Sequence, residues 1–385
     1  MAAKKRKANK VRTEFRKRHD TRTRKRDYTR DFTEVSEEER DDSGIVREER
    51  VSGKGSLTRK RTIVGDLVED ELSGAHVQRE IDLSECVPGR VLSLHGLSSY
   101  VLLEDGRELS CATRGVLKSL SSDQRNVVVA GDAVWVRPIS ADEGVIERVE
   151  PRHGIISRSS RHRQHVLVAN VDRMLIVMSA AEPTIKPNLI DRFLVTAEKA
   201  KIQPIICLNK IDLIDPADLQ PLAGVFGQMG YPILFTSATT KQGMEDLKAM
   251  VIGHQSVVAG QSGVGKSSLL NDIEPGLNLK VSTVSEENQK GRHTTTAARL
   301  FPLTEGGYIV DTPGIRQFEL WDVIPAEVSG FFRDLRPYVS LCRFPDCTHT
   351  HEDDCAIKDA VADGRLDARR YESYCQMFAG ESPGK

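Results

Sequence analysis

Short runs of alternating apolar and polar residues between 87 and 149 predict five β-strands separated by glycines. The expected strands are 90–94, 100–103, 108–112, 133–137 and 145–149. Short strands with turn residues between them are typical of a small closed barrel, most often of the oligonucleotide-binding (OB) type. Such a barrel either binds RNA or only packs against the next domain, and we favour RNA binding.

Between residues 154 and 322 the pattern changes to continuous apolar runs separated by segments of helical period. Because continuous apolar strands are buried on both faces, this alternation predicts a mostly parallel sheet flanked by helices. The expected strands are 174–178, 205–208, 233–235, 257–259 and 308–310, and the expected helices include 190–199 and 244–250. Ligands bind at the carboxyl ends of such strands.

A phosphate-binding loop follows the strand at 257–259 and precedes a helical run, which is the context that this motif requires. Its glycines let backbone N–H groups converge on a phosphate, Lys266 reaches the β and γ oxygens as a catalytic group, and Ser267 can ligate Mg²⁺. The predicted nucleotide ligands here are Gly260, Gln261, Ser262, Gly263, Val264, Gly265, Lys266, Ser267 and Ser268.

Two polar segments after other predicted strands together specify guanine. The carboxylate of Asp212 can accept hydrogen bonds from the ring N–H and the exocyclic amine of guanine, and a backbone N–H after Thr236 can meet the guanine carbonyl. Adenine offers no matching donors, so an ATP-dependent kinase or nuclease is disfavoured. The predicted guanine-binding residues are Asn209, Lys210, Ile211, Asp212, Ser237 and Ala238.

Two more segments complete the predicted phosphate side. Asp311 follows the strand at 308–310 and can hold Mg²⁺ through water, while the N–H of Gly314 can meet a γ-phosphate. The polar loop 291–296 suits a switch that orders around the metal and the γ-phosphate. One of Thr294, Thr295 and Thr296 should ligate Mg²⁺, and we favour Thr295.

The order of these motifs is circularly permuted. In ordinary small GTPases the phosphate loop comes first, whereas here segments 209–212 and 236–238 precede it. The same sheet can form because 241–250 can serve as a helix that bridges the old termini. The chain then leaves the nucleotide domain directly after Gly314, which couples this switch covalently to the C-terminal region.

Cys342, Cys347, His349 and Cys355 form a C-x4-C-x-H-x5-C pattern, and three of the seven cysteines thus lie close together. Without a secretory signal, this crowding indicates metal ligation before disulfides. Three thiolates and one imidazole fill the four positions of a structural Zn²⁺ and leave none open for catalysis. His351 is a rival ligand, and free buried thiols are the alternative.

Charge is distributed unevenly along the chain. Residues 1–30 carry 14 Lys or Arg and a net charge of +11, although the whole chain has a formal net charge of -1. We expect residues 1–80 to be mostly disordered, and the basic arm to bind RNA phosphates instead of serving only as a solubilising tail. The chain has neither a run of about eighteen apolar residues nor an apolar stretch after its charged start, so we expect a cytoplasmic protein without a membrane span.

Three segments closely match the ribosome small-subunit-dependent GTPase A family. They are GQSGVGKSSLLN at 260–271, GRHTTTAARL at 291–300 and CRFPDCTHTHEDDCAIK at 342–358, and the sequence resembles the family over about residues 85–380. The resemblance implies a permuted GTPase domain between an OB barrel and a zinc domain. It also implies GTP hydrolysis stimulated by the small ribosomal subunit, a checkpoint role late in that subunit's maturation, and His349 as the fourth zinc ligand.

Two departures from better-known GTPases concern hydrolysis. Ile315 follows Gly314, so no glutamine stands at the usual water-orienting position and intrinsic hydrolysis should be slow. The resemblance implies that His293 positions the water, and a packing or RNA-binding role is its alternative. Gly263 stands where potassium-stimulated GTPases carry asparagine, which disfavours a potassium requirement.

The sequence therefore predicts an α/β protein in four parts. They are the charged extension at 1–80, the OB barrel at 81–153, the permuted P-loop GTPase domain at 154–322 and a zinc-binding α-helical domain at 323–385. The expected function is that of a monomeric GTP hydrolase, with Mg²⁺ and one structural Zn²⁺, that binds the small ribosomal subunit and its rRNA in the GTP state and leaves on hydrolysis. The alternative is a nucleotide-gated RNA-binding scaffold in which hydrolysis is incidental.

Overall fold

The computed structural model describes residues 10–13, 61–70, 74–79, 83–96, 98–113, 127–160, 163–279, 298–311 and 323–380. The chain divides into two compact units, residues 1–67 with 77–80 and residues 68–76 with 81–385. Within 1–80, β1 (Lys10–Thr13), β2 (Arg61–Asp70) and β3 (Gly74–Arg79) form one sheet, in which β1 and β2 are antiparallel. The disorder expected for the rest of this extension stays a prediction.

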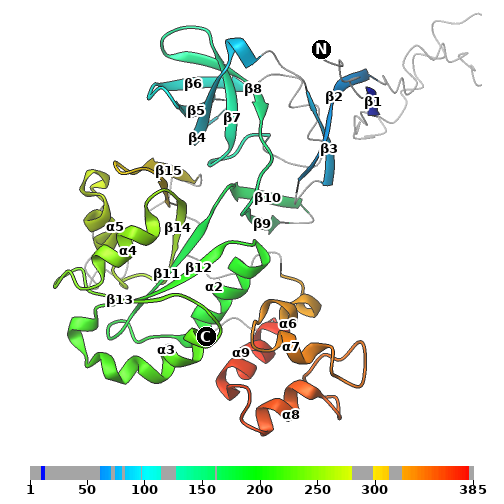
Figure 1. Cartoon of the computed structure of the whole chain (residues 1–385), viewed down its shortest axis with the longest axis vertical. Helices are drawn as coiled ribbons and strands as arrows, with labels where there is room; N and C mark the ends of the chain where they lie inside the picture. The colour runs from blue at the N-terminus through cyan, green and yellow to red at the C-terminus, as the bar shows by residue number, and fades with distance from the viewer. Residues whose placement is uncertain are drawn as a thin grey trace, which may run out of the picture. The chain divides into compact units, whose positions relative to one another are not determined.

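A closed five-stranded barrel follows the short 3-10 helix η2 (Leu83–Glu85), and Figure 1 labels the barrel strands. Its strands are β4 (Val87–His95), β5 (Ser98–Leu103), β6 (Glu108–Thr113), β7 (Ala133–Pro138) and β8 (Glu143–Val149), in the order β4-β5-β6-β8-β7. Only β6 and β8 pair in parallel. Val91, Val101 and Leu109 fill the interior from alternate positions. The predicted five-stranded barrel is confirmed.

The hairpin of β9 (Ile156–Ser160) and β10 (Arg163–Val168) comes next in the chain and was not predicted. A tight junction beyond β10 ties the barrel to the sheet that follows. The side chain of Asn170 donates to the carbonyl of Gly131, and that of Gln255 donates to the carbonyl of Ala169. Gly131 has a φ of 89°, and a Cβ added there would lie 2.2 Å from the Ala169 oxygen, so this junction requires glycine.

The central sheet has six strands in the order β13-β12-β11-β14-β16-β15. They are β13 (Ile233–Thr236), β12 (Gln203–Asn209), β11 (Arg173–Ser179), β14 (Gln255–Ala259), β16 (Tyr308–Asp311) and β15 (Arg299–Pro302). All neighbouring pairs are parallel except β15 with β16. The five predicted strands are confirmed, and β15 is an additional edge strand.

Helices cover both faces of this sheet, which explains its continuous apolar strands. Met174, Ile176 and Met178 of β11 face one core with α2 (Pro187–Lys199) and α3 (Gln220–Gly227). Leu175 and Val177 face a second core with α4 (Met244–Val251) and α5 (Lys266–Ile273). Short 3-10 helices are η3 (Ile211–Leu213), η4 (Pro216–Leu219) and η5 (Pro275–Leu277). None of the described helices is long and apolar enough to cross a membrane.

The C-terminal lobe, residues 323–380, has a small core of its own around Phe332, Ile357 and Tyr374. It contains η6 (Pro325–Glu327), α6 (Val328–Phe331), α7 (Arg336–Val339), α8 (Ala356–Ala362) and α9 (Ala368–Phe378). The helical pattern predicted from 356 to 377 is interrupted, because Gly364 has a positive φ and the side chain of Asp367 caps the start of α9.

Candidate nucleotide site and metal centre

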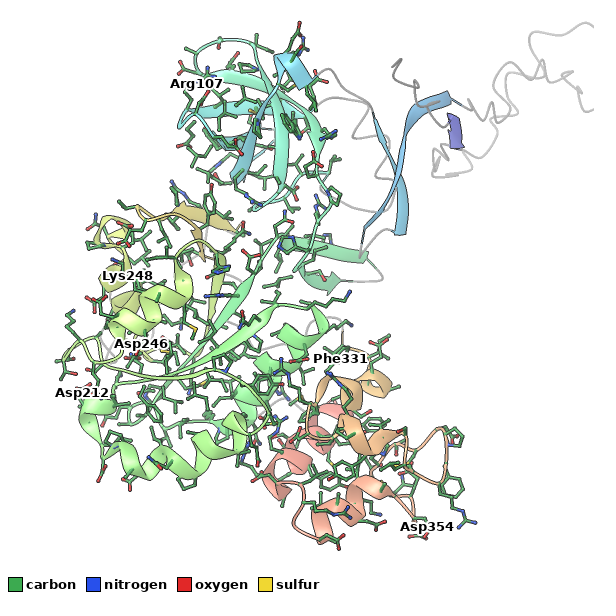
Figure 2. The ribbon with its side chains drawn as sticks, in the orientation of Figure 1. Arg107, Asp212, Asp246, Lys248, Phe331 and Asp354 are labelled. Carbon is green, nitrogen blue, oxygen red and sulfur yellow. The ribbon has the colours of Figure 1, made fainter. Side chains whose placement is uncertain are left out.

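The predicted nucleotide segments meet at one edge of the central sheet. The parallel strands β12, β13, β14 and β16 end there, at Asn209, Thr236, Ala259 and Asp311 respectively. Figure 2 labels Asp212, which follows the end of β12. The topology thus brings the guanine-side and phosphate-side segments together, as expected for a doubly wound sheet.

The phosphate loop has the backbone conformation that glycine permits. Gly260, Gly263 and Gly265 all have positive φ, and a Cβ on Gly260 would lie 2.2 Å from the carbonyl oxygen of Val177. α5 begins directly after Gly265. The Nζ of Lys266 folds back onto the loop and donates to the carbonyls of Gly260 and Gln261, at 2.7 and 2.5 Å. The lysine thus lies where phosphate oxygens would be expected to bind.

Asn209 connects the guanine side to the phosphate loop. Its buried side chain donates through Nδ2 to the carbonyl of Val264 at 2.8 Å, and its Oδ1 accepts from Thr236 Oγ1 at 3.2 Å. Asn209 stays a predicted nucleotide ligand, and its amide also holds three segments of the protein together.

Asp212 is paired with the other guanine segment. Ser237 Oγ donates to Asp212 Oδ1 at 2.6 Å, and the N–H of Thr240 donates to Ser237 Oγ at 3.0 Å. Ser237 is fully buried, whereas Asp212 is exposed to solvent at the edge of the sheet. The serine therefore fixes the carboxylate at a position from which it can accept hydrogen bonds from a base.

The loop from β11 to α2, residues 180–186, also contacts this site and was missed by the sequence analysis. The Nζ of Lys210 donates to the carbonyl of Glu182, and Gln261 Nε2 lies 3.5 Å from the carbonyl of Thr184. Backbone carbonyls leave no residue-type signal in a sequence, so pattern analysis could not find them.

The predicted metal and switch residues are only partly described. Ser267 and Ser268 lie in the first turn of α5, and Asp311 ends β16, the strand beside β14. The remaining predicted residues of the phosphate side lie outside the described residues. They are His293, Thr294, Thr295, Thr296 and Gly314.

A candidate metal centre lies in the C-terminal lobe. The Sγ atoms of Cys342, Cys347 and Cys355 and a ring nitrogen of His349 all lie within 4.8 Å of one another. Cys342 Sγ lies 3.3 Å from His349 Nδ1 and 3.9 Å from Cys355 Sγ. The side chain of His351 is 79% exposed and lies near threonine hydroxyls instead. The geometry therefore groups His349, and not His351, with the cysteines, and these four donors could hold a metal ion.

Burial acts differently on the two kinds of donor in this cluster. It lowers the pKa of His349, which keeps the imidazole in the neutral form that ligates metals, and it raises the pKa of the Cys347 thiol to about 12. Metal binding must therefore displace protons from thiols. The backbone around the cluster is held from α9, since Tyr371 and Tyr374 donate to the carbonyls of His349 and Thr348 at 2.8 and 2.6 Å.

Glu352 organises the turn between these ligands. Its carboxylate accepts hydrogen bonds from the N–H groups of Thr348 and Thr350, at 2.6 and 3.1 Å. Burial alone would raise the pKa of Glu352, but a hydrogen bond from the Thr348 hydroxyl at 2.6 Å, together with these N–H groups, holds it well below its usual range.

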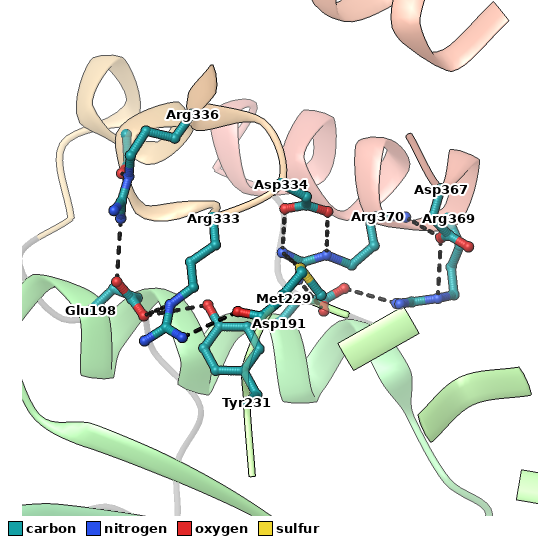
Figure 3. A network of polar contacts seen from close by, with 11 residues as sticks. Asp191, Glu198, Met229, Tyr231, Arg333, Asp334, Arg336, Asp367, Arg369 and Arg370 are labelled. Carbon is teal, nitrogen blue, oxygen red and sulfur yellow. Dashed lines mark hydrogen bonds and ion pairs between the residues drawn. The ribbon is translucent and has the colours of Figure 1, made fainter. Parts of the chain in front are cut away.

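The C-terminal lobe is fixed to α2 by the buried charged network in Figure 3. Arg370 donates to Asp191 of α2 at 2.6 Å and binds both carboxylate oxygens of Asp334, at 2.9 and 2.7 Å. Arg369 donates to the second oxygen of Asp191 at 2.8 Å. Two turns further along α2, Glu198 accepts from Arg333 and Arg336. One face of α2 therefore anchors the lobe that carries the metal ligands.

The barrel contacts the sheet at β15 and β16. The guanidinium of Arg90 on β4 lies 5.8 Å from the centre of the Tyr308 ring on β16. Leu92 of β4 belongs to the same core as Leu300 of β15 and Val310 of β16. The barrel and the C-terminal lobe thus contact different elements of the nucleotide domain.

Comparisons with known proteins agree with this architecture. The sequence model of the RsgA GTPase family matches residues 149–321. The chain is 41% identical over 296 residues to a protein of Thermotoga petrophila named small ribosomal subunit biogenesis GTPase RsgA, and the match covers 75% of this chain and 95% of the relative.

Two crystal structures are also similar to the chain. YjeQ from Thermotoga maritima has a TM-score of 0.64 and 36% identity, with 78% of this chain and all of that chain covered. YloQ, described as a circularly permuted GTPase, has a TM-score of 0.61 and 31% identity, with 80% and 100% covered. From this identity over nearly the whole length of a relative, the chain belongs to the RsgA GTPase family.

Proposed function

We propose that the protein hydrolyses GTP and acts in the biogenesis of the small ribosomal subunit. The observation that carries the GTPase proposal is the hydrogen bond from Asn209 to the Val264 carbonyl, which joins a guanine-recognition segment to a phosphate loop at one sheet edge. The ribosomal role is supported by the printed name of relatives such as that of Thermotoga petrophila.

The phosphate side of the site can bind and polarise GTP. The loop N–H groups and Lys266 hold the β and γ oxygens, once Lys266 leaves the carbonyls that it contacts here. Ser267 and Asp311 offer the hard oxygen donors that Mg²⁺ prefers, on neighbouring elements of the sheet edge. When bound, Mg²⁺ would neutralise the charge that develops on the phosphate oxygens.

We propose that residues of the predicted switch loop activate the attacking water. His293 would position the attacking water, and Thr295 would complete the metal site in the GTP state. Since Ile315 stands where a glutamine usually orients the water, turnover should be slow until the ribosomal subunit completes the site.

Zinc is the metal that best fits the four donors of the C-terminal lobe. Three thiolates and an imidazole are the soft and borderline ligands of structural zinc sites. The lobe has only a small core, so the ion would act by stabilising its fold. All four positions are filled by protein, which leaves no position for substrate.

The proposed contact with rRNA depends on the basic arm more than on the barrel. The five barrel strands carry three arginines and three glutamates, so they add no net positive charge. Residues 1–30 carry +11. Deleting them should weaken subunit binding chiefly at low salt and flatten its dependence on salt concentration. An unchanged salt slope would contradict an RNA-binding arm.

The decisive experiment is GTP turnover with and without purified small ribosomal subunits, with wild type and Ser267→Ala. Stimulation of the wild type by subunits, and its loss in the variant, are the expected results. No stimulation would contradict the proposed function. Equal stimulation by naked RNA would favour the RNA-binding scaffold. We further propose that the protein is a cytoplasmic monomer, and light scattering of the purified protein tests its monomeric state.

A further inference from the structure

Ser179 is a buried hydroxyl at the carboxyl end of β11, directly beside the guanine-recognition segment. It is 0% exposed and pairs with Asn209 across the parallel register of β11 and β12. Its Oγ donates to the carbonyl of Glu182 at 2.9 Å, and the next N–H, of Ala180, donates to the carbonyl of Asn209 at 2.7 Å. The first bond closes a turn at the start of the β11–α2 loop, and the second joins this start to β12.

The same Glu182 carbonyl holds a residue of the predicted guanine site. It accepts a hydrogen bond from the Nζ of Lys210, the residue between Asn209 and Ile211. Lys210 has a φ of 65° and a ψ of 35°, a left-handed conformation that costs a non-glycine residue free energy. Such a conformation persists where surrounding contacts impose it, and strained residues of this kind cluster at ligand sites.

We propose that Ser179 is a positioning residue for guanine nucleotide binding. It orients the Glu182 carbonyl, and this carbonyl fixes the ammonium group of Lys210, so that the lysine side chain is held beside the base site before nucleotide arrives. Ser179 itself touches no nucleotide. Preorganisation of this kind raises affinity because less side-chain freedom is lost on binding. The inference rests on the proposed binding of GTP.

The first test compares Ser179→Ala with a matched control, Ser256→Ala. Ser256 is also 0% exposed and lies on the neighbouring strand β14, but its hydroxyl has no hydrogen-bond partner among the described residues. By titration with fluorescently labelled GDP and GTP, Ser179→Ala should raise both Kd values about three- to tenfold, the effect of one lost hydrogen bond. Ser256→Ala should leave both near the wild-type values. Ser179→Cys keeps a weaker donor and should give intermediate values.

A double-mutant cycle with Lys210→Ala separates positioning from a general loss of stability. If Ser179 acts through Lys210, adding Ser179→Ala to Lys210→Ala should change Kd no further. Additive effects of the two substitutions would overturn the inference, and so would an unchanged Kd for Ser179→Ala in a protein whose wild type binds GDP. A wild type that binds neither nucleotide would instead contradict the proposed function, and this inference with it.

Discussion

Arg370 of α9 and Asp191 of α2 form a buried ion pair, with Nη1 and Oδ1 2.6 Å apart and the two side chains 1% and 0% exposed. Asp334 binds the other side of the same guanidinium, which also lies 4.5 Å from the centre of the Phe332 ring. One arginine thus satisfies carboxylates of both the nucleotide domain and the C-terminal lobe. Fully paired, the group stabilises a specific contact, but each member becomes costly if its partner is removed.

Arg370→Ala should lower the free energy of unfolding by about 3–5 kcal/mol, because Asp191 and Asp334 would keep buried negative charge without a full set of partners. Urea denaturation followed by circular dichroism measures this. Arg365→Ala is the control, since Arg365 pairs with Asp363 at the surface, where both side chains are more than half exposed. Arg365→Ala should lower the free energy of unfolding by less than about 1 kcal/mol. Equal losses in the two variants would contradict the structural importance of the buried pair.

Removal of the metal should unfold the C-terminal lobe selectively. Elemental analysis of gently purified protein should find about one zinc per chain, and chelation should expose the lobe to proteolysis. His349→Ala should lower the zinc content strongly, whereas His351→Ala should leave it unchanged, since the side chain of His351 lies outside the cluster. A full zinc content in His349→Ala would disprove the assigned ligand set.

Asp212→Asn should shift the base preference of the site from guanine towards xanthine. A carboxylate accepts two hydrogen bonds from guanine, whereas an amide presents a donor that clashes with the exocyclic amine but suits the carbonyl that xanthine carries at that position. The affinity of the variant for GTP should fall by at least about tenfold. Xanthosine triphosphate should bind the variant more tightly than it binds the wild type. Competition binding measures both. Retained GTP preference would mean that Asp212 does not face the base.

Glu274 provides a test of pH dependence. Its Oε2 accepts from the N–H of Thr304 at 2.7 Å, and this hydrogen bond lowers the pKa of Glu274 below its ordinary value of 4.5. A depressed folded pKa means that the stabilisation is present above about pH 4.5 and is lost as the pH falls through the folded pKa. Glu274→Gln should therefore be less stable at pH 7, by less than about 1 kcal/mol, with a smaller difference near pH 4. A difference independent of pH would contradict this linkage.

The spacing of apolar residues and the positions of turn residues were sufficient to predict most of the fold. The barrel strands alternate between apolar and polar residues, and the sheet strands are continuously apolar because helices cover both faces. The strand β15 was not predicted because only Leu300 of its four residues is fully buried. The β9–β10 hairpin was not predicted because its polar first strand, Ile-Ser-Arg-Ser-Ser, lacks the alternation of apolar and polar residues that marks a half-buried strand.

The motifs predicted which segments converge but not how the protein holds them. Asn209 could be named as part of a guanine motif, yet its bond to the Val264 carbonyl depends on a fold that brings together residues 55 positions apart. In the same way, sequence cannot distinguish Arg370, which is buried against Asp191, from Arg365, which is exposed on the same lobe. Long-range partners of charged residues are set by packing and not by local pattern.

The position of β14 matters for the synthesis of the chain. β14 lies between β11 and β16 in the sheet, but β11, β12 and β13 all precede it in sequence. During translation the edge of β11 that will receive β14 therefore emerges without a partner, although Met174 to Met178 are all apolar and become buried. An unpaired apolar edge is prone to pair with other chains. β14 itself, Gln255–Ala259, directly precedes the phosphate loop, so this edge is covered only when the chain has been made as far as the nucleotide site.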